Sequence, residues 1–136
     1  MDNNDIAKEW LIFAKRDLDT AMHLINTMYP KPLEIICYHC QQSAEKVLKG
    51  YLILHETMPP RTHDLLLLCE MCAQKNNDFN DIVNNCSLIT MYGVQSRYPF
   101  EIEITEIEAE KATQIANDIY SFVMQKVRDY FSPEKL

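Results

Sequence analysis

The chain has 136 residues, of which 47% are hydrophobic and only two are glycine, and its formal net charge is −7. This length suits one domain with a real core, and the scarcity of glycine argues against a turn-rich β-protein and favours long helices. A broad grip on nucleic acid requires a basic surface, so the charge excludes coating DNA but not a small, focused anion site. We expect a single domain over residues 1–136, with residues 132–136 forming a frayed tail.

The sequence also indicates a compartment and the state of its cysteines. The N-terminal residues are polar and acidic, unlike a secretory signal, and no apolar run reaches the roughly 20 residues needed to span a bilayer. Five cysteines, an odd number, favour free thiols in a reducing compartment. We therefore expect a cytoplasmic protein without membrane contact. The pairs Cys37/Cys40 and Cys69/Cys72 resemble zinc ligands, but they lie on apolar helix faces without a tight turn, so we expect buried thiols and no metal.

Apolar residues recur at steps of three and four in five segments, which predicts helices over about residues 5–28, 32–55, 63–74, 79–95 and 106–131. Prolines or asparagines separate several of these segments. We therefore expect an all-α, up-and-down bundle of four long helices and one short helix. The second helix carries a wide apolar face, so it is expected at the centre. Residues 100–104 alternate apolar and acidic side chains, which favours an extended connector.

A polar row crosses the second helix at helical spacing and contains His39, Gln42, Lys46 and Lys49. Its amide and ammonium groups suit an anion, and the alternative is a solvated face. Asp17 lies on the core stripe of the first helix, so its carboxylate needs hydrogen-bond donors. Either a neighbouring helix supplies them or the residue has a functional role. No spacing to a partner is evident for His39.

Further candidates lie at the ends of the third and fourth predicted helices. His63 is the best acid–base candidate because Asp64 could orient it, and the alternative is a histidine that bridges the connection. Arg97 follows a helix end, where its guanidinium suits a phosphate or caps helix carbonyls. Tyr92 and Tyr98 suit stacking against a base or an amphipathic position at the core edge.

Four short motifs then occur in order along the chain. They comprise Trp10, Ala14, Asp17-Leu18 and Ala21; Gln41-Gln42-x-x-Glu45-Lys46-x-Leu48-Lys49; Thr62-His63-Asp64-Leu65; and Tyr92 followed by Arg97-Tyr98-Pro99. In this combination the chain resembles the HEPN domain family, named for nucleotide-binding in higher eukaryotes and prokaryotes. The resemblance implies a helical bundle that often forms homodimers and accompanies a small nucleotidyltransferase, as in toxin–antitoxin pairs.

The resemblance also implies a specific chemistry, from which this chain departs. Many HEPN domains are metal-independent endoribonucleases in which an arginine is followed four to six residues later by a histidine that serves as acid or base. No histidine follows Arg97. We therefore expect a non-catalytic module that binds a nucleotide-like anion or RNA, or docks a nucleotidyltransferase, without a cofactor. The alternative is a toxin-like endoribonuclease that uses Arg97, with His63 as the remaining catalytic candidate.

Overall fold

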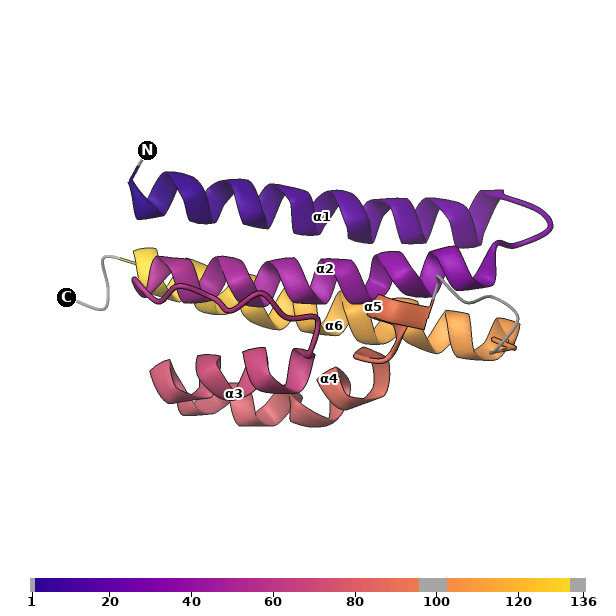
Figure 1. The fold of residues 1–136 in the computed structure, drawn as a ribbon. Helices are drawn as coiled ribbons and strands as arrows, with labels where there is room; N and C mark the ends of the chain where they lie inside the picture. The colour runs from indigo at the N-terminus through magenta and orange to yellow at the C-terminus, as the bar shows by residue number, and fades with distance from the viewer. Residues whose placement is uncertain (1, 96–102, 133–136) are drawn as a thin grey trace.

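The computed structural model describes residues 2–95 and 103–132, and within these ranges the only regular elements are helices. Three long helices are α1 (Asn3–Thr27), α2 (Leu33–Leu54) and α6 (Glu106–Phe131). Shorter helices between α2 and α6 are α3 (Leu65–Lys75), the 3₁₀-helix η1 (Asn77–Ile82), α4 (Val83–Ile89) and α5 (Tyr92–Gln95). The chain is thus an all-α bundle, as predicted (Figure 1).

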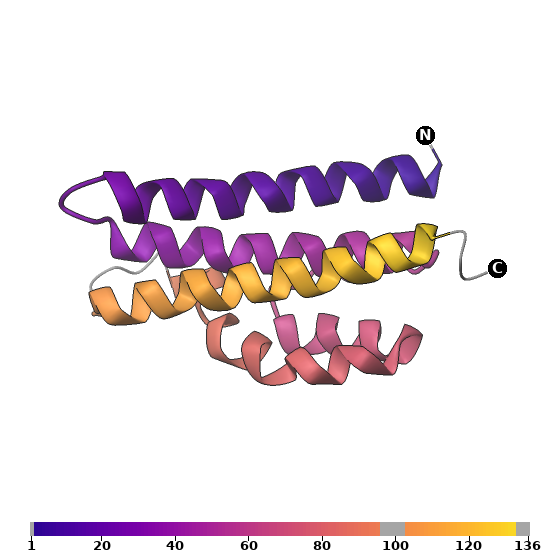
Figure 2. The ribbon, with the colours of Figure 1, turned by 180° about the vertical axis from the view of Figure 1, so that it is seen from behind.

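Helix α2 is the central element of the bundle. It packs against α1, α6, α3, α4 and α5, and most of its second half is buried. Figure 1 shows α2 between α1 and the layer that contains α3 and α4, and Figure 2 shows α6 running along it from behind. A helix with so wide an apolar face must be covered on several sides, so the structure confirms the predicted central position.

Small residues let α1 and α2 approach closely. Ala14 is fully buried in α1, and its carbonyl accepts a hydrogen bond of 2.8 Å from Ser43 Oγ of α2. A Cβ on Gly50 would lie only 2.9 Å from Leu11 Cδ2. Because packed interiors leave no spare volume, these contacts fix the register of the two helices and so the position of every polar side chain along α2.

The helix starts use side-chain caps at positions that differ from some predictions. Asp2, rather than residues 3–5, caps α1 by accepting a 2.9 Å bond from the Asp5 amide. Asp64 is the N-cap of α3, where Thr62 was expected, so His63 precedes this helix instead of beginning it. Thr105 and Glu108 form a capping box at the start of α6.

The continuous helix predicted over residues 79–95 is wrong, because η1, α4 and α5 replace it. The apolar spacing was real, since Phe79, Cys86 and Ile89 are all buried. The break comes at Thr90, whose hydroxyl accepts a 2.9 Å bond from the Leu65 amide and donates a 3.3 Å bond to the His63 carbonyl. These bonds to the start of α3 compete with continued helix.

The five cysteines are all buried and free. Cys72 Sγ donates to the Leu48 carbonyl at 3.6 Å, as expected for thiols used as small core residues. Within the described ranges no cluster of three or more metal-ligating side chains occurs, and none of the helices there is long and apolar enough to cross a membrane. The predicted connector at residues 100–104 and the predicted tail lie mostly outside the described residues.

Candidate functional site

A first polar cluster joins α1 to α2 around Asp17. Its carboxylate accepts a 2.6 Å hydrogen bond from Lys46 Nζ through Oδ2, and Oδ1 lies 2.8 Å from His39 Nδ1. Burial raises the pKa of Asp17, but the hydrogen bonds from His39 and Lys46 together outweigh burial, so the pKa is lowered overall. The donors that Asp17 was expected to need therefore come from α2, and His39, for which no partner was foreseen, is one of them.

A second cluster lies along α2 around the buried carboxylate of Glu45. Its Oε2 accepts a 3.0 Å bond from Lys49 Nζ, and its Oε1 lies 2.8 Å from His63 Nδ1. Glu45, and not Asp64, is thus the carboxylate that orients His63. The Asp64 side chain is used elsewhere, because it accepts from the Leu66 and Leu67 amides at the start of α3.

Gln41 connects this second cluster to the rest of the fold. Its Nε2 donates to the His63 carbonyl at 3.0 Å, and its Oε1 accepts from Gln42 Nε2 at 2.9 Å. A Cβ on Gly93 of α5 would lie 2.6 Å from Gln41 Cδ, so glycine is needed for this approach. Gln41 therefore ties α2 to the entry of α3 and to α5.

The structure brings some of the predicted site residues together and separates others. Gln42, Lys46 and Lys49 lie on the polar side of α2 and His63 adjoins it, although each lysine already has a carboxylate partner. Tyr92 is buried, and this burial raises its pKa to about 12, which matches a core-edge position. Arg97 and Tyr98 lie outside the described residues.

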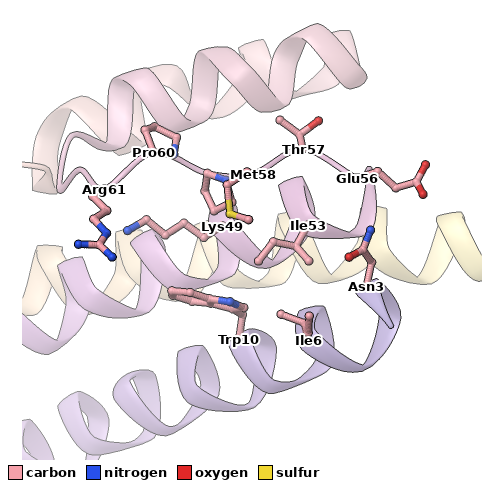
Figure 3. Close-up of a pocket in the computed structure, with 11 residues that line it drawn as sticks. Asn3, Ile6, Trp10, Lys49, Ile53, Glu56, Thr57, Met58, Pro60 and Arg61 are labelled. Carbon is pink, nitrogen blue, oxygen red and sulfur yellow. The ribbon is translucent and has the colours of Figure 1, made fainter. Parts of the chain in front are cut away.

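A cavity of about 440 Å³ adjoins the second cluster. It opens between α1, the last turns of α2 and residues 56–61, and Figure 3 shows Trp10, Lys49 and Arg61 around one end. The Lys49 ammonium lies 5.7 Å from the centre of the Trp10 ring, a cation–π contact. Sequence reasoning assigned Trp10 to the core and left Arg61 without a role.

Helical spacing contained a signal for part of what was missed. His39 and Lys46 are seven residues apart on α2, which places them on one face, and an acidic residue in the core stripe of α1 is the natural partner of such a pair. The role of Arg61 had no such signal, because it depends on how residues 56–61 cross the end of α2.

The family model for the HEPN domain matches residues 7–127 of this chain. Among solved structures, TT1696 from Thermus thermophilus superposes with a TM-score of 0.73 at 26% identity, covering 88% of this chain and 97% of that one. ST0689, described as an archaeal HEPN homologue, has a TM-score of 0.69 at 26% identity, covering 89% and 97%. A search of curated proteins found no match. Since the family model spans most of the chain, including α1, α2 and α6, this protein belongs to the HEPN domain family.

Proposed function

We propose that this chain is a non-catalytic HEPN module that binds a nucleotide-like anion on the polar side of α2. The observation that carries the proposal is the pairing of both lysines there: Lys46 with Asp17 at 2.6 Å and Lys49 with Glu45 at 3.0 Å. Paired lysines offer oriented donors but little net positive charge. The charge for an anion must therefore come from an arginine, and we assign that role to Arg97, which follows the last residue of α5 by two positions.

The position of α5 supports this assignment. Gly93 of α5 lies against Gln41, and Gln41 is bonded to both Gln42 and the His63 carbonyl. The polar side of α2 is thus adjacent to the helix that leads to Arg97. An arginine fork suits a phosphate group, and the neighbouring Tyr98 suits stacking on a base.

The histidines support binding rather than catalysis. All four precede Arg97 in the chain, and His63, the best acid–base candidate, is already engaged with Glu45 at 2.8 Å. The nearby acidic residues of the sequence, such as Glu103, would repel a phosphodiester. Cleavage of RNA through an arginine followed by a histidine is therefore not the chemistry that we assign to this chain.

Calorimetry with ATP and other nucleotides tests the binding proposal. We expect saturable binding by the native protein and its loss in Arg97→Ala, with binding retained in the control Arg128→Ala on the exposed side of α6. Equal binding by native protein and Arg97→Ala would refute the role of Arg97. Incubation with total RNA tests the alternative, because cleavage by native protein that disappears in Arg97→Ala would establish an endoribonuclease.

A second surface favours the proposed protein partners, a second copy of the chain or a small nucleotidyltransferase. An apolar groove of about 500 Å³ runs between α1 and α6, and its walls include Ile12 and Phe131, which are 52% and 48% exposed. Exposed apolar surface of this kind marks interaction sites. We expect light scattering to show a dimer that Ile12→Glu dissociates. A native protein that is monomeric would point instead to the nucleotidyltransferase as the occupant.

A further inference from the structure

The cavity beside Trp10 has the size of a small-molecule site. Its volume of about 440 Å³ lies within the range of about 300–1,000 Å³ that is usual for ligand pockets. Three chain segments form its walls: the first turns of α1, the end of α2 and residues 56–61 (Figure 3). Apart from Lys49, its lining residues differ from those that we assign to the nucleotide-like anion.

One end of the cavity is cationic and carries about one net charge. In Figure 3 the Arg61 guanidinium and the Lys49 ammonium lie close to each other at this end, above the Trp10 ring. Glu45 Oε2 lies 3.0 Å from Lys49 Nζ and offsets its charge. Within residues 2–95 and 103–132 Arg61 forms no ion pair. The sum of these charges favours a monoanion over a dianion such as a phosphate monoester.

The middle of the cavity is apolar, and its other end is acidic. Ile6, Ile53 and Met58 line the middle, and Glu56 lies at the end opposite to Arg61 (Figure 3). An apolar ligand body gains free energy by leaving water between such side chains. The Glu56 carboxylate disfavours a second negative charge at the far end of a ligand.

The backbone at Glu56 supports a functional reading of this wall. Its φ of 57° is the only positive value at a non-glycine residue in the described part of the chain. The conformation ends α2 through bonds of 3.0 Å from the Glu56 amide to Ile53 and from the Thr57 amide to Leu52, a helix end at which glycine is usual. Non-glycine residues held in this region cluster at ligand sites.

We propose that this cavity binds a monocarboxylate with an apolar tail. The carboxylate accepts hydrogen bonds from Arg61 and Lys49, and the tail lies between Ile6, Ile53 and Met58. The site is separate from the one assigned to the nucleotide-like anion, and Lys49 is the residue that the two share. Arg61 is therefore the position at which the two proposals are tested independently.

Trp10 is the only tryptophan of the chain, so its fluorescence reports on this cavity alone. We expect octanoate to change the emission saturably, and octylammonium and the dicarboxylate suberate to bind at least about tenfold more weakly, since one charge-assisted hydrogen bond is worth that factor. Arg61→Gln should weaken octanoate binding about tenfold for the same reason. The matched control Arg16→Gln, an exposed arginine on α1 outside the cavity, should bind as the native protein does.

Three results would overturn the proposal: no saturable change with millimolar octanoate, equal binding of octylammonium, or an unchanged affinity in Arg61→Gln. Both Arg61 and Met58 are exposed enough for their variants to fold, and equal melting temperatures check this. Met58→Ser tests the tail contact separately, and it should weaken octanoate while leaving ATP binding unchanged. Arg97→Ala should have the opposite pattern, so failure of one proposal is distinguishable from failure of the other.

Discussion

The substitution Asp17→Asn tests whether the first polar cluster stabilises the fold. The Asp17 side chain is 12% exposed, and its partners Lys46 and His39 are each 27% exposed. Asparagine has nearly the same shape but no charge, so the variant weakens both interactions without leaving a cavity. It also leaves Lys46 in a half-buried position without an anion.

The exposure of the cluster sets the expected cost. Breaking a fully buried pair costs about 3–5 kcal/mol, whereas an exposed pair is worth less than about 1 kcal/mol. Hydrogen bonds to charged groups contribute about 1.5–3 kcal/mol each. After discounting for solvent screening of the half-buried partners, we expect Asp17→Asn to lower the free energy of unfolding by about 2 kcal/mol at pH 7.

Urea unfolding followed by circular dichroism measures this change, and the same helix offers a control. Asp19 bonds to Lys15 at 2.6 Å, but these side chains are 59% and 51% exposed. Asp19→Asn should therefore cost less than about 0.5 kcal/mol. A cost for Asp17→Asn no larger than that of the control would refute the stabilising role of the cluster.

The pH dependence gives a second test with a defined sign. Burial raises the pKa of Asp17, but the hydrogen bonds from His39 and Lys46 lower it further, so the folded pKa lies below the unfolded one. Asp17 then contributes stability above its unfolded pKa and loses it as the pH falls through the folded pKa. The difference between native protein and Asp17→Asn should narrow in acid, and a constant difference would contradict the assigned cause.

Three further substitutions or reactions have defined outcomes. Gly93→Ala should lower the free energy of unfolding by about 1–3 kcal/mol, because its Cβ would lie 2.6 Å from the buried Gln41 amide; unchanged urea unfolding would contradict this. Glu56→Gly should raise it by about 1 kcal/mol through relief of the positive φ, and a lower melting temperature would count against that strain. Burial raises the pKa of Cys37 to about 12, so thiol reagents at pH 8 should label it only as fast as the protein unfolds.

Helical periodicity predicted the elements whose burial follows one continuous stripe. The segment predicted over residues 106–131 coincides with α6 (Glu106–Phe131), since an unbroken apolar stripe and a capping box both mark that helix. The segment over residues 79–95 failed because Thr90 bonds to the start of α3. That contact joins residues far apart in sequence, and no local pattern encodes it.

The candidate site divides in the same way. The need of Asp17 for donors followed from its place in a core stripe, but the identity of those donors, Lys46 and His39, depends on the register of α1 against α2. Asp64 was chosen as the partner of His63 because it is adjacent in sequence. Glu45, eighteen residues earlier, holds that position instead because α2 runs beside the entry of α3.

The placement of carboxylates on and beside α2 narrows which cations are free for function. A central helix that buries Lys49 and half-buries Lys46 must supply each with an anion, because an unpaired ammonium there would cost several kcal/mol, on the order of 3–5. Glu45 and Asp17 meet that requirement, so loss of either lysine should affect stability before it affects binding. The arginines carry no such structural obligation in our proposals. Ligand binding that depends on Arg61 or Arg97, in variants with native melting temperatures, is therefore the observation that separates function from folding in this family member.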